Sequence, residues 1–242
     1  MWVVAHRGAS GHAPENTMAA FRRAVDLGAQ FIETDLQISR DARVIAMHDL
    51  TLDRTTNGHG PVHQQTLKEI RALDAGSWFA SSQAESFAGE RVPTLQEIFQ
   101  FSEERDVNFY LEIKSGANWG VEHAVVAAVR ELNAIARVVI LSFDSSTLDS
   151  VYRLDETIMT GFLCEHPSSD LVERSVQVGA RQLAPRGDLV TPALVKKAHN
   201  AGLQVVTWTI NEPEQMRRLI DAGVDGIMTD YPDRLVQVLQ GK

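Results

Sequence analysis

Residues 205–229 read VVTWTINEPEQMRRLIDAGVDGIMT and contain one complete pattern of strand, helix and strand. A β-branched run opens the stretch, and Met216, Leu219 and Ile220 then form one apolar helical face. The dipeptide Ala222-Gly223 follows, just before the next apolar run. Apolar residues three and four positions apart are typical of an amphipathic helix, and glycine suits the left-handed position after its last turn. We therefore expect a strand, a helix and a second strand parallel to the first.

The same alternation recurs along the 242 residues of the chain. We predict strands in the short apolar or β-branched runs Trp2–Ala5, Phe31–Gln37, Val44–Met47, Phe109–Ile113, Val138–Ser142, Ile158–Cys164, Gln182–Ala184, Val205–Ile210 and Gly226–Thr229. Glycine follows an expected helix at Leu27-Gly28, Val178-Gly179, Ala201-Gly202 and Ala222-Gly223. Two helices are expected to begin with capping boxes, at Thr94–Glu97 and Asn211–Glu214.

Alternating strands and helices predict a parallel sheet with its helices outside. Eight such units in a chain of this length favour a closed (β/α)8 TIM barrel, one domain over residues 1–242, rather than an open doubly wound sheet. The G-x-G-x-x-G motif of dinucleotide-binding folds is absent after the first expected strand, which also disfavours the open sheet.

Two places interrupt the alternation. Residues 38–43 are too few for a helical crossover, so the flanking strands must form an antiparallel hairpin. A turn centred near Asp41 would bring His48 back beside Thr34. Residues 50–92 are much longer than a usual βα loop, and we expect them to form a small inserted subdomain over the catalytic face of the barrel.

Composition excludes several classes of protein. The net charge of −9 argues against a nucleic-acid binder, which needs a basic surface. The single cysteine, Cys164, excludes an intrachain disulfide and a multi-thiolate metal site, and it is expected to end a buried strand. The longest apolar run, Ala124–Val129, is far shorter than the roughly 20 residues that cross a bilayer. With no basic leader before an apolar region, we expect a soluble intracellular protein without stable membrane association.

Polar residues collect where the expected strands end, which is the edge at which TIM barrels carry their active sites. They are His6-Arg7, Glu33-Thr34-Asp35, His48-Asp49, Glu112-Ile113-Lys114, Asp144 and Asp230, and the seventh strand bears Trp208. Alternate residues of a strand share a face, so Glu33 and Asp35 should point together, as should Glu112 and Lys114. Ile32, Leu111 and Ile113 should then face the helices.

This set of residues allows only a narrow chemistry. Three converging carboxylates require protons, cations or a metal to offset their charge, and an all-oxygen set favours Mg²⁺ or Ca²⁺. Arg7 and Lys114 could hold an anionic, phosphate-like group beside that metal. Two histidines, His6 and His48, could divide the roles of general base and general acid. Together these groups are what the cleavage of a phosphodiester requires.

Structural roles compete with this interpretation for each residue taken singly. An isolated Glu112–Lys114 pair or an isolated His6 is more often structural, and on sequence alone Trp208 is expected in core packing. Asp144 and Asp230 are interpreted as loop or helix-cap residues. No patterned partner accompanies the remaining histidines, which we assign to surface or packing: His12, His59, His63, His123, His166 and His199. What favours catalysis is the convergence of seven polar residues: two histidines, three carboxylates, one arginine and one lysine.

The chain resembles the glycerophosphodiester phosphodiesterases, most closely the short cytoplasmic bacterial members. The resemblance is carried, in order, by His6–Thr17 (HRGASGHAPENT), Glu33-Thr34-Asp35, His48-Asp49, Leu52–Gly58 (LDRTTNG), Val92–Leu95, Glu112-Ile113-Lys114 and Thr207–Asn211. It spans nearly the whole chain and implies a TIM barrel with the insertion after His48-Asp49. Family members hydrolyse glycerophosphodiesters, such as glycerophosphocholine and glycerophosphoethanolamine, to glycerol 3-phosphate and an alcohol.

The resemblance also implies roles for individual residues. Glu33, Asp35 and Glu112 would hold one divalent cation, Mg²⁺ or Ca²⁺, and His6 and His48 would form the acid/base pair. The phosphate and glycerol contacts would come from Arg7, Lys114 and Trp208. The order in which the histidines act, the preferred alcohol and the oligomeric state stay open.

Two alternatives follow from the same residues. The substrate could be a lysophospholipid or another lipid phosphodiester, cleaved by phospholipase D-like or cyclising chemistry, with Trp78, Phe79 and Phe87 of the insertion as an apolar track. The barrel could also bind phosphorylated polyols without catalysis, although a pure binder needs no acid/base pair.

Overall fold

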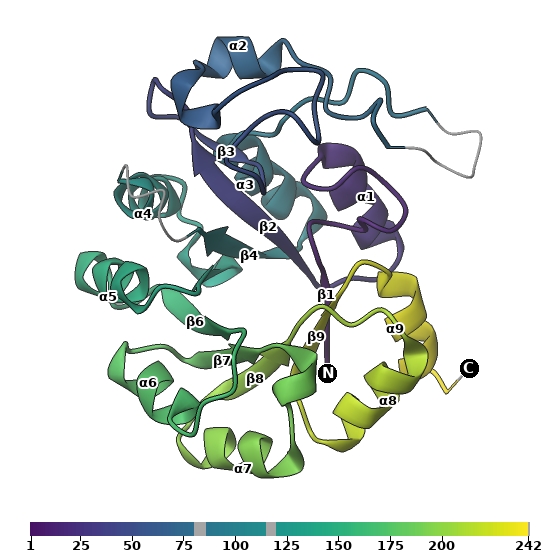
Figure 1. The fold of residues 1–242 in the computed structure, drawn as a ribbon, viewed down its shortest axis with the longest axis vertical. Helices are drawn as coiled ribbons and strands as arrows, with labels where there is room; N and C mark the ends of the chain where they lie inside the picture. The colour runs from purple at the N-terminus through teal and green to yellow at the C-terminus, as the bar shows by residue number, and fades with distance from the viewer. Residues whose placement is uncertain (80–85, 115–119, 242) are drawn as a thin grey trace.

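A closed barrel of parallel strands forms the centre of the molecule, with helices around it (Figure 1). The computed structural model describes residues 1–79, 86–114 and 120–241. The strands are β1 (Trp2–Ala5), β2 (Phe31–Ile38), β3 (Val44–Ala46), β4 (Asn108–Ile113), β5 (Val138–Ser142), β6 (Met159–Cys164), β7 (Gln182–Pro185), β8 (Gln204–Thr207) and β9 (Gly226–Thr229). Every predicted strand is therefore present, and the largest difference is that β8 ends at Thr207 instead of Ile210.

The barrel closes between the first and last strands. β1 pairs in parallel with β9, with Ala5 opposite Thr229, and on its other side with β2, where Val4 lies opposite Phe31. The remaining order runs β9-β8-β7-β6-β5-β4-β2, so the eight parallel strands form a ring. The predicted (β/α)8 TIM barrel is confirmed.

The predicted hairpin is confirmed as well. β3 pairs antiparallel with β2, with Leu36 opposite Ala46 and Ile38 opposite Val44. Continued by two residues, this register places His48 opposite Thr34, and the bond from Met47 N to Asp35 O, 2.9 Å, extends the ladder in that direction. The hairpin thus carries His48 back toward the mouth of the barrel.

Helices follow each barrel strand and cover the outside of the ring. They are α1 (Met18–Asp26), α3 (Leu95–Arg105), α4 (Val121–Glu131), α5 (Ser145–Leu154), α6 (Leu171–Gln177), α7 (Pro192–Asn200), α8 (Pro213–Asp221) and α9 (Pro232–Leu239). The four glycines predicted after helices have φ of +89°, +70°, +78° and +87°, at Gly28, Gly179, Gly202 and Gly223 respectively. This backbone region favours glycine, which explains the recurring helix end.

One of the two predicted capping boxes is correct. Thr94 and Glu97 exchange side-chain and backbone hydrogen bonds at the start of α3. The second prediction was wrong: α8 begins after Glu212, whose side chain makes no capping bond, and Pro213 occupies the first turn. Asn211 instead turns its side chain to Asp230, whose backbone N–H donates to Asn211 Oδ1 over 2.9 Å. Asn211 thus bonds to a residue just after β9 and does not cap its own helix.

Two hydrophobic clusters stabilise the barrel. The larger lies between the strands and the surrounding helices and includes Ile32, Leu111 and Ile113, as their alternation predicted. The smaller fills the barrel interior with inward side chains of the strands: Val4, Tyr110, Val139, Leu141, Leu163, Ala184, Val206 and Met228. The interior is therefore packed, and only its mouth is available for a site.

Residues 50–92 carry little regular structure in their described part, which leaves out residues 80–85. They contain a short 3-10 turn at Val62–Gln64 and the helix α2 (Leu67–Arg71). Ile70 and its neighbours pack on β3 in a separate hydrophobic cluster, and Arg71 pairs with Glu97 of α3 at 2.7 Å. Across the described part of the chain, no helix combines the length and the apolar character needed to span a bilayer.

Candidate active site

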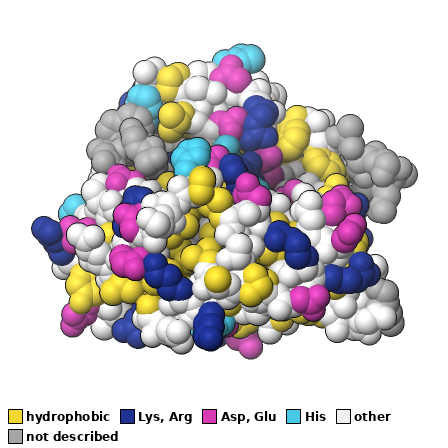
Figure 2. Space-filling view, turned by 60° about the horizontal axis from the view of Figure 1, so that its bottom comes forward, with side chains coloured by type: hydrophobic (Ala, Val, Ile, Leu, Met, Phe, Trp, Pro, Cys, Tyr) yellow, Lys and Arg dark blue, Asp and Glu magenta, His cyan; other side chains and the backbone are white. Residues whose placement is uncertain are grey.

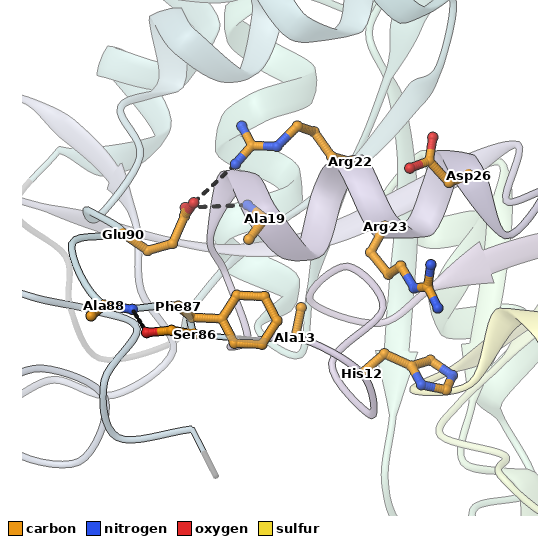
Figure 3. A pocket seen from close by; sticks show the side chains of 10 residues that line it. All are labelled: His12, Ala13, Ala19, Arg22, Arg23, Asp26, Ser86, Phe87, Ala88 and Glu90. Atoms are coloured by element: carbon orange, nitrogen blue, oxygen red, sulfur yellow. Dashed lines mark hydrogen bonds and ion pairs between the residues drawn. The ribbon is translucent and has the colours of Figure 1, made fainter. Parts of the chain in front are cut away.

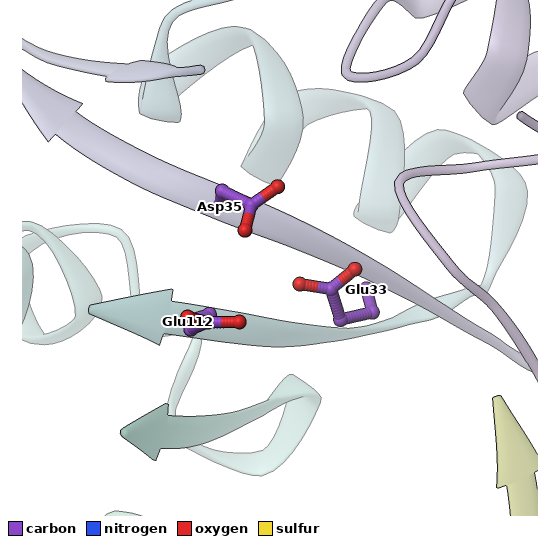
Figure 4. Close-up of side chains that lie close together, drawn as sticks. All are labelled: Glu33, Asp35 and Glu112. Carbon is purple, nitrogen blue, oxygen red and sulfur yellow. The ribbon is translucent and has the colours of Figure 1, made fainter. Parts of the chain in front are cut away.

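Three buried carboxylates converge at the carboxyl ends of β2 and β4 (Figure 4). Glu33 and Asp35 come from β2, and Glu112 from β4, where it lies directly opposite Asp35. One oxygen from each lies within 4.8 Å of the others. The shared face predicted from strand alternation brings them together, at spacings that a single cation could bridge.

Two cations only partly neutralise this cluster. Lys114 Nζ lies 2.7 Å from Asp35 Oδ1 and 2.8 Å from Glu112 Oε1, and Arg7 Nε lies 3.3 Å from Asp35 Oδ2. Burial alone would raise the pKa of Asp35, but Lys114 and Arg7 outweigh it and hold that pKa well below its usual range. Burial and the Asp35 charge raise the pKa of both Glu33 and Glu112. The two cations therefore do not offset the charge of three fully ionised carboxylates, and the cluster favours a proton or a further cation.

The carboxylates suit a hard divalent cation. Glu33 Oε2 accepts the backbone N–H of Arg7 at 2.9 Å, whereas the buried Oε1 has no hydrogen-bond partner in the described chain. Within the described residues, Asp35 Oδ1 and Glu112 Oε1 also lack a hydrogen bond of good geometry, although the Lys114 ammonium lies close. Buried oxygens without hydrogen bonds, in an all-oxygen set, match the ligands of Mg²⁺ or Ca²⁺.

His6, directly after β1, stands beside the carboxylates and is held from behind by an aspartate. Its Nδ1 lies 2.7 Å from Asp230 Oδ1, and its Nε2 lies 4.0 Å from Glu33 Oε2. Burial lowers the pKa of His6, but the Asp230 hydrogen bond and the Glu33 charge outweigh burial, so its pKa is raised. Asp230 is further held by Ser10 Oγ at 2.9 Å and Asn211 Nδ2 at 2.6 Å.

His48, beyond β3, has the same kind of support. Its Nδ1 lies 2.6 Å from Oδ1 of the neighbouring Asp49. The Arg54 hydrogen bonds hold the pKa of Asp49 at about 2, so this carboxylate only accepts and His48 Nδ1 must donate. Burial lowers the pKa of His48 despite the charge of Asp35 and the hydrogen bond to Asp49. Both histidines thus have Nδ1 fixed, which leaves Nε2 for another partner.

Trp208 lies past the end of β8, on the other side of the mouth. Its Nε1 donates to Ala184 O at 2.8 Å, and its ring meets Phe143 edge-on, with centroids 5.4 Å apart. Both rings pack on the interior cluster of the barrel but stay partly exposed. In Figure 2, histidine and charged side chains gather near the middle of one face, beside a patch of hydrophobic ones.

Sequence reasoning missed four residues that support the site. Asp230, interpreted as a loop or cap residue, faces His6 because β9 closes the barrel against β1. Asn16 donates to Asp35 Oδ2 at 2.8 Å, and Glu15 and Arg54 pair with each other. The position of Asp230 at the end of the last strand was the one available signal. By contrast, Asp144 caps α5 as expected, through the N–H of Ser146.

Other candidate features lie apart from this site. Burial raises the pKa of the Cys164 thiol to about 12, which suits a packing role. His12 and His199 pair with Asp233 and Asp225. A cavity of about 330 Å³ lies beside α1 (Figure 3), where Glu90 accepts from Arg22 and from the Ala19 N–H; these bonds attach the inserted segment to α1.

Comparisons with known proteins agree on one family. The model of the glycerophosphoryl diester phosphodiesterase family matches residues 6–234. A glycerophosphodiester phosphodiesterase of Caldanaerobacter subterraneus subsp. tengcongensis is 40% identical over 240 residues, 98% of this chain and 97% of that protein. One from Bacillus subtilis is 35% identical over 99% of this chain and 86% of that protein.

A solved structure agrees with these sequences. It is that of an Oleispira antarctica phosphodiesterase in complex with the product sn-glycerol-3-phosphate. Its TM-score is 0.89 at 29% identity, covering 99% of this chain and 97% of the other.

Proposed function

Because the chain belongs to the glycerophosphoryl diester phosphodiesterase family and is a hydrolase of glycerophosphodiesters, we propose that it uses a divalent cation and two histidines to cleave small, deacylated substrates. Glycerophosphocholine and glycerophosphoethanolamine would yield sn-glycerol 3-phosphate and the free alcohol. The observation that carries the proposal is the buried carboxylate cluster flanked by His6 and His48, in which Glu33 Oε1 has no hydrogen-bond partner among the described residues.

Glu33, Asp35 and Glu112 would hold the cation, Mg²⁺ or Ca²⁺. When bound, such an ion neutralises phosphate charge and polarises a phosphoryl oxygen. The protein contributes the fixed positions of the carboxylates: Asn16 orients Asp35, and the Arg7 N–H orients Glu33. Their mutual repulsion in this structure is the physical reason to expect cation binding.

The two histidines would move protons through Nε2. In each imidazole an aspartate accepts from Nδ1, so the ring is oriented and its tautomer is set. A base and an acid placed this way are each worth about 10²–10⁴-fold in rate. One would deprotonate the attacking oxygen and the other would protonate the leaving alkoxide oxygen.

Arg7 and Lys114 would bind the phosphate. The Arg7 side chain donates one hydrogen bond within the described residues, to Glu15 at 2.9 Å, and so retains N–H groups for a ligand. Lys114 Nζ contacts two carboxylates. Because an ammonium carries three N–H groups, one is left for a phosphate oxygen. Trp208 would form the wall against which the glycerol packs.

The described aromatic side chains of the insertion support a small substrate. Phe87 is buried against Ala13 and Ala20, and Phe79 meets it edge-on at 5.7 Å. Trp78 in turn packs edge-on against Phe79. The three rings thus pack against one another and against the start of the chain at Ala13 and Ala20. This packing disfavours them as a binding surface for an acyl chain.

The test is release of glycerol 3-phosphate from glycerophosphocholine, with lysophosphatidylcholine assayed in parallel. We expect turnover of the deacylated diester, loss of turnover with a chelator, recovery with Mg²⁺ or Ca²⁺, and a loss of about 10³-fold in His6→Ala. Turnover that survives both chelation and His6→Ala would overturn the mechanism. Faster turnover of the lysolipid would favour the lipid alternative, and tight binding without turnover would favour the non-catalytic one.

A further inference from the structure

Arg54, in the inserted segment, contacts two carboxylates at once. Its Nη1 and Nη2 donate to the two oxygens of Glu15, both at 2.8 Å. Its Nε and Nη2 donate to the two oxygens of Asp49, at 2.7 Å and 3.0 Å. Two edges of one planar guanidinium are therefore occupied by bidentate pairs, the arrangement that best defines the orientation of a carboxylate.

Each of these carboxylates also contacts a residue of the proposed reaction. Asp49 Oδ1 accepts from His48 Nδ1 at 2.6 Å, and Glu15 Oε1 accepts from Arg7 Nη1 at 2.9 Å. The contacts form one continuous series, His48–Asp49–Arg54–Glu15–Arg7. We propose that Arg54 is a positioning residue that sets the orientation of the proton-transferring His48 and the phosphate-binding Arg7 together; this rests on the proposed function.

A purely structural ion pair is the competing explanation. The Arg54 side chain is 43% exposed, and exposed ion pairs contribute little to folding stability. Its partners are less exposed, however, at 13% for Glu15 and 27% for Asp49. A modest stabilising effect is compatible with a large effect on orientation, because a displacement of about 1 Å at a reacting group can cost about 10²-fold in rate.

Charge gives Arg54 a second effect at the mouth. Arg7 and Arg54 together balance the charges of Glu15 and Asp49, so this series of residues is neutral apart from His48. Without Arg54 it would carry one excess negative charge beside the site that must capture an anionic phosphodiester. In a chain of net charge −9, such a loss should weaken substrate binding.

Arg71 offers a matched control in the same segment. It donates to both oxygens of Glu97, at 2.8 Å and 2.7 Å, and to Val92 O at 3.0 Å. This bidentate pair attaches the segment to α3 without touching the site. Arg71→Gln therefore removes a bidentate ion pair of the same kind and reports what loosening of the segment alone would do.

The experiment measures kcat and KM of the full chain on glycerophosphocholine with saturating Mg²⁺ or Ca²⁺. We expect Arg54→Gln to lower kcat about 10–100-fold and to raise KM about tenfold, and Arg71→Gln to stay within about twofold of the unsubstituted protein. The contacts of Arg54 through Asp49 and through Glu15 should have different effects. Asp49→Asn should act mainly on kcat, and Glu15→Gln mainly on KM. An Arg54→Gln protein with unchanged kinetics, or an equal loss in Arg71→Gln, overturns the proposal.

Two further measurements guard against a folding defect. Added guanidinium should restore part of the kcat of Arg54→Ala, whereas Arg54→Lys should stay impaired because one ammonium cannot form two bidentate pairs. The NMR signals of the His48 imidazole should shift in Arg54→Gln and stay unchanged in Arg71→Gln; an unshifted spectrum overturns the proposal even without an activity assay. Absent turnover in the unsubstituted protein would instead refute the proposed function.

Discussion

The two sides of the barrel mouth differ in character although they share one backbone geometry. On β2 and β4 the inward positions near the mouth are carboxylates, Glu33, Asp35 and Glu112, with His6 just after the adjacent β1. On the side of β5 to β8 the inward positions nearest the mouth are apolar, and Phe143 and Trp208 border the mouth there.

The difference shows how a barrel can keep its charged groups on one side of the mouth and its apolar contact surface on the other. A low-dielectric aromatic wall strengthens the electrostatic interactions across from it, and it packs against the uncharged part of a ligand. On the charged side, burial and then the repulsion of Asp35 raise the pKa of Glu33 and Glu112. We therefore expect substitutions on the charged side to reduce turnover and those on the aromatic side to reduce binding.

Removing one carboxylate from the charged side should have the largest effect. Asp35→Asn should lower kcat/KM by about 10³-fold or more, because the proposed cation would lose a charged ligand while Lys114 and Arg7 lose their shared partner. Steady-state kinetics across a metal titration measures it. Asp144→Asn, the same chemical change beyond β5, should stay within about twofold, since asparagine caps α5 equally well. Equal losses in the two variants would erase the distinction between the sides.

Weakening the support of His6 by Asp230 should lower turnover less than removing a carboxylate of the cluster does. Asp230→Asn keeps the shape of the side chain but removes the charge that stabilises the protonated imidazole, and we expect kcat to fall about 10–100-fold with KM nearly unchanged. The variant should keep its fold, because Asn211 and Ser10 can still bond to the amide. A purely structural Asp230 would instead lower the melting temperature and leave kcat intact.

Substitution on the aromatic side should have a smaller effect, and it should change KM rather than kcat. Trp208→Ala removes the ring packed on Phe143 and should raise KM about tenfold, with kcat retained within a few-fold, as expected for lost apolar contact. Trp208→Phe is the matched control, because it keeps a ring and loses only the bond to Ala184 O. A fall in kcat without a change in KM would contradict the division of tasks.

The smallest effect is expected beyond the mouth, at Trp78. Its ring packs on Phe79 and its Nε1 donates to Ala75 O, so Trp78→Ala should change turnover of glycerophosphocholine by less than about twofold. The same variant assayed on lysophosphatidylcholine tests the lipid alternative. A selective loss there would show that the insertion contacts an acyl chain after all.

Local periodicity accounts for what was predictable about the site. Residues two apart on a strand share a face, so the meeting of Glu33 with Asp35 follows from spacing alone, and the short link at residues 38–43 sufficed to predict that His48 returns toward the mouth. The capping box at Thr94 was predictable for the same reason, since both of its partners lie within one turn.

Partners distant in sequence were not predictable. The second capping box failed because Asn211 bonds to Asp230 rather than to its own helix. Arg54 lies 39 residues from Glu15 and drew no interpretation of its own, since nothing local indicates which carboxylates a guanidinium will reach.

The amino-acid sequence by itself determined the alternation of strands and helices, the eight units that favour a barrel and the polar residues at the strand ends, because these are read from spacing along one chain. Only the tertiary structure decided which aspartate supports which histidine. His6 and Asp230 are 224 residues apart, and they meet because β1 pairs with β9 when the ring closes. A hydrogen bond depends on distance in space, and barrel closure sets that distance.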